Sequence, residues 1–268
     1  MSFKNKTVIV TGASSGVGAA CAKMFASNGA NVVIAARSKG ALDVLAKELG
    51  DKVFAHATDV SSLEACRLLI ATTVEKFGGV DVLVNNAGFN SRGDVFDVSV
   101  EDMDQIIDVN LKGPMRLSRL ALPYLLKSAH GSIVNVASLA GRFPLDGEAS
   151  YSSSKFGLRA FSLALAEELR ETAVSVSIVS PGPIETGFIL DDIDEVPDLV
   201  FSQPMSTAEE VAENVLRSAD DGKQERAMPA ASGILATTGY LFPSLRRVMK
   251  PVLEAQGKRA KARYMSRR

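Results

Sequence analysis

The chain has 268 residues, 46% of them hydrophobic and 23% charged, which is typical of a globular protein with a sizeable core. Its net charge of −1 argues against a general nucleic-acid-binding protein. The two cysteines and two histidines do not have the spacing of zinc ligands or of a disulfide framework, so we expect no metal site and a reducing compartment. Because we find neither a signal peptide nor a membrane-spanning run, we expect a cytoplasmic protein.

Short runs rich in valine and isoleucine alternate with longer amphipathic segments along the chain. Such runs predict the strands of a parallel sheet that is buried on both faces. The alternation predicts an α/β fold, a doubly wound sheet of seven strands with helices on both faces. The expected strands are 6–11, 31–36, 52–57, 80–85, 132–137 and 174–179, and the expected helices are 16–28, 40–49, 61–77, 99–127 and 150–171.

The pattern changes after the last of these strands. Residues 183–205 are acidic and weakly periodic, which indicates a mobile loop or a small helical insert. A helix capped by Thr207 should follow, because acidic residues stand in its first turn. No linker separates a second domain, so we expect a dinucleotide-binding and catalytic region over 1–228 and an extension of the same domain over 229–268.

The extension is amphipathic and basic. Residues 246–268 hold nine lysines and arginines against one acid, Glu254, so this segment carries +8 and the rest of the chain −9. Pro251 should kink or end the helix expected here. The helix could pack on its own domain with a solvated basic tail, close a substrate pocket, pack against another subunit or lie on an anionic membrane surface. Its apolar stripe is Leu241, Leu245, Val248, Met249 and Val252.

A glycine-rich turn, TGASSGVGAA, follows the first expected strand and opens a helix. Gly12, Gly16 and Gly18 would allow a tight turn and a close approach of the backbone to a pyrophosphate. The N-terminus of the helix would add free N–H groups and a favourable dipole. By itself the turn is equally consistent with a purely structural role.

The end of the second strand indicates which nucleotide binds. Sites that select NAD carry an acid there, but this strand ends in Ala35-Ala36-Arg37-Ser38. Arg37 can pair with a 2′-phosphate, assisted by the hydroxyls of Ser14, Ser15 or Ser38. The alternative is that Arg37 is a solvated turn residue. The missing acid favours NADP(H).

The stretch YSSSK places Tyr151 and Lys155 one helical turn apart on one face. An isolated pair of this kind is most often two solvated residues. Here it stands in order with T-G-x-x-x-G-x-G at 11–18, N-N-A-G at 85–88, Ser138 thirteen residues before the tyrosine, and P-G at 181–182. Together these motifs resemble the short-chain dehydrogenase/reductase family over about residues 4–190.

The resemblance implies a catalytic set of Asn110, Ser138, Tyr151 and Lys155. Tyr151 would be the general acid or base, with its pKa lowered by the positive charges of Lys155 and the oxidised nicotinamide. Lys155 would also hold the nicotinamide ribose. Ser138 would bind the carbonyl oxygen, and Asn110 would help to hold a water that connects Lys155 to solvent.

The expected cofactor contacts come partly from these motifs and partly from the arguments on the turn and Arg37. Asn86 and its neighbours would brace the strand edge near the cofactor. The full expected set is Gly12, Ser14, Ser15, Gly16, Val17, Gly18, Arg37, Asp59, Val60, Asn86, Ala87, Gly88, Tyr151, Lys155, Pro181, Gly182, Ile184 and Thr186.

We therefore expect an NADP(H)-dependent oxidoreductase that acts on a carbonyl or secondary alcohol, assembled as a dimeric or tetrameric homo-oligomer. Apolar side chains in the two loops that would form the substrate wall predict an apolar substrate. The alternatives are a catalytically silent NADP(H)-binding sensor or scaffold of the same fold, and an epimerase or dehydratase. The apolar loop residues are Phe143, Leu145, Phe188, Ile189 and Leu190.

Overall fold

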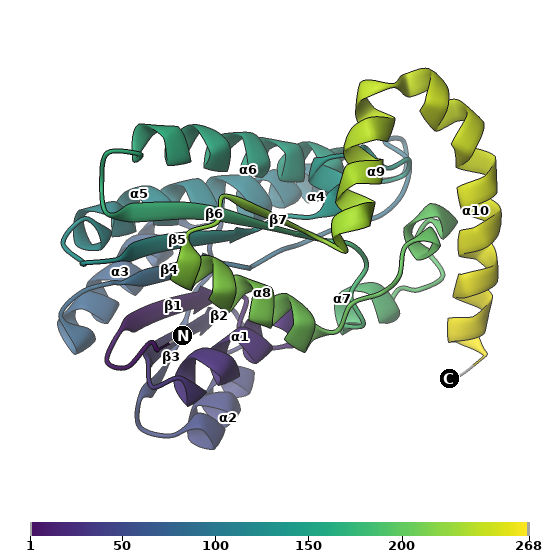
Figure 1. Ribbon diagram of the computed structural model, residues 1–268. Coiled ribbons are helices and arrows are strands. Elements are labelled where there is room, and N and C mark those ends of the chain that lie inside the picture. Colours follow the sequence, from purple (N-terminus) through teal and green to yellow (C-terminus); the bar gives the residue numbers. More distant parts are fainter. Residues whose placement is uncertain (1, 267–268) are drawn as a thin grey trace.

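The apolar runs form one parallel sheet in the computed structural model, which describes residues 2–266 (Figure 1). The seven strands lie in the order β3-β2-β1-β4-β5-β6-β7, which confirms the predicted doubly wound sheet. The order reverses between β1 and β4, and sheets of this kind bind ligands at that point. The strands are β1 (Thr7–Thr11), β2 (Asn31–Ala36), β3 (Val53–Ala57), β4 (Val82–Asn85), β5 (Gly131–Val136), β6 (Val174–Pro181) and β7 (Glu225–Met228).

Helices cover both faces of the sheet (Figure 1). Successive residues of a strand point to opposite faces, so β1 contributes Val8 and Val10 to one core and Ile9 to the other. The first core includes α1 (Gly16–Ser27), α2 (Lys39–Leu49) and α8 (Ala208–Asp221). The second includes α3 (Leu63–Phe77) and α5 (Gly113–Leu125), and α6 (Ala149–Glu168) packs through Leu158 against β6.

The helix predicted over 99–127 is divided by a wider turn. α4 (Val100–Ile107) leads into a π-helical turn, η1 (Asp108–Lys112), which continues into α5. Asn110 lies in this turn and is fully buried. Its side chain bonds to the backbone of Phe89, and such π-turns often mark functional sites.

The segment 183–205 is the small helical insert, one of the two structures predicted for it. It contains α7 (Gly187–Leu190) and the 3₁₀ turn η3 (Asp198–Ser202), while a second 3₁₀ turn, η2 (Leu139–Gly141), follows β5. The N-cap predicted for α8 is also confirmed. Thr207 Oγ1 accepts from the Glu210 amide at 3.1 Å, and the Glu210 carboxylate accepts from the Thr207 amide at 2.9 Å.

The C-terminal extension forms two helices, α9 (Ala230–Leu241) and α10 (Pro243–Met265). The helix does not end at Pro251, so that alternative was wrong. Pro251 is exposed, and the carbonyl group that its ring deprives of a partner can bond to water. Figure 1 shows α10 bending in its first half, the distortion that proline causes in a continuous helix. Arg267 and Arg268 of the basic segment lie outside the described residues.

No helix among residues 2–266 is both long enough and apolar enough to cross a membrane.

Candidate active site

A cavity of about 530 Å³ lies at the carboxyl edge of the sheet. One end reaches the glycine-rich turn after β1, and the other reaches α6 and the helical insert. Of the residues predicted to form the site, only Gly18 and Asn110 do not line this cavity. The predicted residues that do line it are Gly12, Ser14, Ser15, Gly16, Val17, Arg37, Asp59, Val60, Asn86, Ala87, Gly88, Ser138, Tyr151, Lys155, Pro181, Gly182, Ile184 and Thr186.

In the glycine-rich turn, neighbouring backbone occupies the space that side chains at two of the glycines would need. Gly12 has a φ of +65°, and a Cβ there would stand 2.7 Å from the Ala87 Cα. A Cβ at Gly18 would stand 2.2 Å from the Gly12 carbonyl oxygen, so Gly18 acts through packing rather than by lining the cavity. The backbone of this turn and the N–H groups at the start of α1 fit the pyrophosphate of a dinucleotide.

Asn86 and Thr11 join the turn to the neighbouring strand end. The Asn86 amide nitrogen Nδ2 donates to the Thr11 carbonyl at 2.9 Å. Thr11 Oγ1 in turn accepts from the backbone N–H groups of Asn86 at 3.0 Å and Ala87 at 3.1 Å. These bonds hold the ends of β1 and β4 together, the bracing role that the sequence predicts for Asn86.

The nucleotide end of the cavity is bounded by Arg37 and Asp59. Arg37 is exposed at the end of β2, and the structure gives it no ion pair among the described residues. Asp59 accepts from the amide and hydroxyl of Ser61, at 2.9 and 2.7 Å, and keeps its carboxylate at the surface. A free guanidinium at this edge suits a phosphate group.

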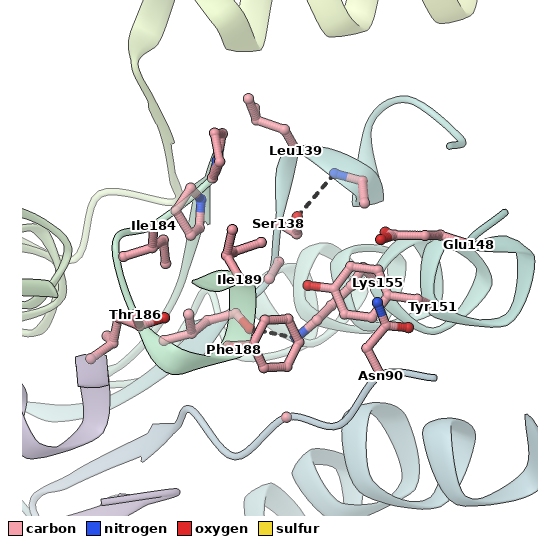
Figure 2. A pocket seen from close by; sticks show the side chains of 18 of the residues that line it. Asn90, Ser138, Leu139, Glu148, Tyr151, Lys155, Ile184, Thr186, Phe188 and Ile189 are labelled. Carbon is pink, nitrogen blue, oxygen red and sulfur yellow. Dashed lines mark hydrogen bonds between the residues drawn. The ribbon is translucent and has the colours of Figure 1, made fainter. Parts of the chain in front are cut away.

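The other end of the cavity brings together Tyr151, Ser138 and Lys155, with the tyrosine and lysine on successive turns of α6 (Figure 2). Lys155 is 4% exposed, and its Nζ donates to the Val136 carbonyl at 3.1 Å. The same nitrogen lies 5.7 Å from the centre of the Tyr151 ring. Ser138 Oγ accepts from the Ala140 amide at 3.1 Å, which orients the hydroxyl.

Burial shifts the pKa values of both Lys155 and Tyr151. It lowers the pKa of Lys155 to about 8, because the charged ammonium loses its water. The pKa of Tyr151 is raised, first by burial and then by the negative charge of Glu148, while the Ser138 hydroxyl and the charge of Arg92 act in the opposite direction. The lowering of the Tyr151 pKa that the sequence predicts depends on Lys155 together with the oxidised nicotinamide, so it stays a prediction. Tyr151 is held as the neutral phenol at neutral pH.

Asn110 lies beneath the cavity instead of in its wall. Its Oδ1 accepts from the Phe89 amide and its Nδ2 donates to the Phe89 carbonyl, both at 2.8 Å. Nδ2 also donates to Ser154 Oγ on α6 at 3.1 Å. Asn110 thus connects the loop after β4 to α6 and positions both.

Sequence reasoning missed a buried ion pair beside Tyr151. Arg92 and Glu148 have side chains only 5% and 4% exposed, with Arg92 Nε 3.2 Å from Glu148 Oε1. Burial raises the pKa of Glu148, and the charge of Arg92 opposes that change. The two residues are 56 positions apart in loops that look solvated, so no local pattern reveals the pair.

Arg92 also holds the helical insert against the site. Its Nη2 donates to the Phe188 carbonyl at 3.0 Å, and its guanidinium carbon lies 5.5 Å from the centre of the Phe188 ring. The Phe188 ring is in turn 6.1 Å from the ring of Tyr151. Figure 2 shows Phe188, Ile189 and Asn90 beside Tyr151. The insert therefore forms one wall of the reaction end of the cavity.

Four of the five apolar side chains predicted for the substrate wall line the cavity. These are Phe143, Leu145, Phe188 and Ile189, whereas Leu190 packs against the apolar cluster formed within the insert. Both C-terminal helices also line the cavity; the sequence left open whether this extension closes a pocket. Leu235, Ala236 and Gly239 come from α9, and Met249, Lys250 and Leu253 come from α10.

Comparison with known proteins agrees with this geometry. The sequence model of the short chain dehydrogenase family matches residues 6–195, and the chain belongs to that family. It is 38% identical over 189 residues to the 3-oxoacyl-[acyl-carrier-protein] reductase FabG of Thermotoga maritima, covering 69% of this chain and 77% of that protein. An uncharacterised oxidoreductase of Staphylococcus epidermidis is 36% identical over 183 residues, with 68% of this chain and 80% of that protein covered.

A third relative extends further along the chain. The uncharacterised oxidoreductase YxnA of Bacillus subtilis is 33% identical over 262 residues, which cover 94% of this chain and 73% of that protein. This match must include part of 229–268. The protein is thus an oxidoreductase of the short-chain dehydrogenase family, whose members use a nicotinamide cofactor.

Proposed function

We propose that this protein is an NADP(H)-dependent reductase of an apolar carbonyl compound, with Tyr151 as the general acid. The observation that carries the proposal is one cavity with a phosphate-binding turn and Arg37 at one end and Tyr151, Ser138 and Lys155 at the other. Reversal of the same chemistry would oxidise a secondary alcohol.

Each residue at the reaction end of the cavity has a separate role in the proposed reaction. The cofactor supplies the hydride when bound, and the chain holds the substrate and delivers the proton. Ser138 donates a hydrogen bond to the carbonyl oxygen and stabilises the charge that develops there. Tyr151, which is a neutral phenol at neutral pH, donates its phenolic proton to the same oxygen. Lys155, whose Nζ lies 5.7 Å from the centre of the Tyr151 ring, would hold the nicotinamide ribose and assist the return of the proton.

NADP(H) is favoured over NAD(H) by the charges at the end of β2. Arg37 and the hydroxyl of Ser38 border the cavity, and no acid stands beside them in 35–38 to bind ribose hydroxyls. A charge-assisted bond from Arg37 to a 2′-phosphate contributes about 1.5–3 kcal/mol, which corresponds to about 10- to 150-fold in affinity.

The substrate class follows from the wall of the reaction end. Apolar side chains such as Phe143, Leu145 and Phe188 line the cavity, and the buried charges of Arg92 and Glu148 are paired with each other. A ketone or aldehyde with a hydrocarbon chain matches this wall, as apolar pockets with few polar groups generally do for apolar ligands. The FabG relative is a reductase of an acyl-chain carbonyl by its name, which supports a chain of this kind.

Turnover of aliphatic ketones and aldehydes of increasing chain length, followed by the absorbance of NADPH, tests the proposal. Tyr151→Phe should lower turnover by about 10²- to 10⁴-fold while cofactor affinity stays nearly unchanged. Tyr124→Phe on α5 is the matched control and should leave turnover intact. Full activity of Tyr151→Phe, or no carbonyl reduced across the panel, would contradict the assigned reaction.

A further inference from the structure

One face of α10 carries a continuous stripe of solvent-exposed side chains. Its residues follow one another at spacings of three and four, so they lie along one side of the helix. The first half is apolar and the second half is basic. Val248 is 75% exposed and Val252 68%, although apolar residues at helical spacing normally face a core. This outer stripe consists of Leu245, Val248, Val252, Ala255, Arg259 and Arg263.

The corner between α9 and α10 extends the apolar half of the stripe. Tyr240, Leu241 and Phe242 are 53%, 63% and 60% exposed, and Leu245 follows them at the start of α10. Figure 1 shows this corner at the outer limit of the molecule, away from the sheet. A contiguous apolar surface of this kind, bordered by charged residues, marks an interaction site.

The opposite face of α10 already anchors the helix to its own domain. Gly257 lies against the Asp198 carbonyl, where an added Cβ would stand 1.8 Å from the oxygen. Lys261 Nζ donates to the carbonyls of Asp194 at 3.0 Å and Val196 at 2.8 Å. The outer stripe is therefore not needed to attach α10, and its exposure calls for a partner outside this chain.

The charge of the surface identifies that partner. Arg247, Lys258, Arg259 and Arg263 are exposed on α10. A second copy that docked through the same stripe would place basic on basic if parallel, and apolar on basic if antiparallel. An anionic bilayer surface suits both halves, because apolar side chains enter the acyl boundary while arginine and lysine bind lipid phosphates.

We propose that the α9–α10 corner and the outer stripe dock this chain on an anionic membrane surface. The inner faces of the same helices line the cavity through Leu235, Gly239, Met249 and Leu253. Docking would hold the apolar wall of the cavity close to the bilayer, from which an apolar carbonyl compound can partition. This consequence for substrate rests on the proposed reductase function, whereas the docking does not.

The test is co-sedimentation of the full chain with vesicles of phosphatidylcholine, alone or mixed with phosphatidylglycerol. The chain should bind the mixed vesicles, bind neutral vesicles at least tenfold more weakly, and lose affinity as salt is raised. Arg259→Glu with Arg263→Glu should weaken binding about 30-fold or more, because each basic residue near an anionic surface strengthens it about fivefold. Val248→Asp with Val252→Asp should weaken it at least tenfold.

Two substitutions on α2 are the matched controls. Val44 is 70% exposed and Lys47 is also exposed. Val44→Asp and Lys47→Glu introduce the same kinds of charge change on a surface away from the stripe, so both variants should bind vesicles as the parent does. Thermal unfolding confirms that each variant is folded. Binding is measured without cofactor or substrate, so failure of docking is distinguishable from failure of the proposed reaction.

Three results would overturn the proposal. The first is no binding to the mixed vesicles, and the second is binding that the stripe variants leave unchanged. The third is a dimer on size-exclusion chromatography that Val248→Asp with Val252→Asp dissociates, without vesicle binding, since this would assign the surface to a second copy of the chain.

Discussion

Replacing Lys155 by methionine should stabilise the fold at neutral pH while it abolishes activity. Lys155 is buried, and burial lowers its pKa from 10.5 to about 8. At pH 7 the folded protein therefore holds a charged ammonium away from water. Methionine is close to lysine in length and apolar, so Lys155→Met removes this unfavourable burial of charge.

The gain in unfolding free energy from Lys155→Met should become smaller as pH rises. Between pH 8 and 10.5 the unfolded chain binds more protons at Lys155 than the folded chain, so the stability of the parent rises with pH there. At pH 7 the penalty is about 3 kcal/mol of unfolding free energy. Loss of the hydrogen bond to the Val136 carbonyl offsets about 1 kcal/mol at every pH. The variant should be about 2 kcal/mol more stable at pH 7 and about equal to the parent at pH 10.

Urea unfolding followed by circular dichroism measures this difference, and it suits a chain without tryptophan. Lys47→Met, at an exposed lysine of α2, is the control and should show no pH-dependent change relative to the parent. If the difference in unfolding free energy between Lys155→Met and the parent stayed constant from pH 7 to pH 10, the assigned cause would be refuted. A change in packing alone does not depend on pH in this range.

Two further predictions concern packing around the site. Gly18→Ala should prevent NADPH binding at concentrations that saturate the parent, because the new Cβ would stand 2.2 Å from the Gly12 carbonyl; unchanged affinity by fluorescence titration would contradict this. Arg92→Ala should lower the unfolding free energy by about 3–5 kcal/mol, because Glu148 is left buried without its partner. Arg67→Ala breaks an exposed ion pair with Glu64 and should change the unfolding free energy by less than about 1 kcal/mol. Equal losses of unfolding free energy in the two variants would argue against a stabilising role of the buried pair.

Most of the sheet was predictable from the sequence because its strands are buried on both faces. Such strands are uninterrupted apolar runs, as in TVIVT of β1 and NVVIAA of β2. The edge strand β7 has the sequence ERAM and shows no such run. It pairs with β6, and an ion pair with a residue far away in the sequence also holds it, since Glu225 accepts from Nε and Nη2 of Arg159 on α6, both at 2.9 Å.

The site likewise has one part that was predictable from local sequence and one part that was not. Short-range spacing predicts that Tyr151 and Lys155 share one face of a helix, and both line the cavity. The Arg92–Glu148 pair was not predictable, because its burial depends on how two remote loops fold over the insert. The raised pKa of Tyr151 was not predictable either, since it results first from the burial of the tyrosine itself and then from the charge of Glu148.

The most direct test of the account is titration of the purified protein with NADPH and, separately, NADH, followed by nicotinamide fluorescence. The account predicts about 10- to 150-fold tighter binding of NADPH, and Arg37→Asp should remove most of this preference. Binding of NADH as tight as that of NADPH, or a preference that survives Arg37→Asp, would contradict the assignment of NADP(H) through Arg37.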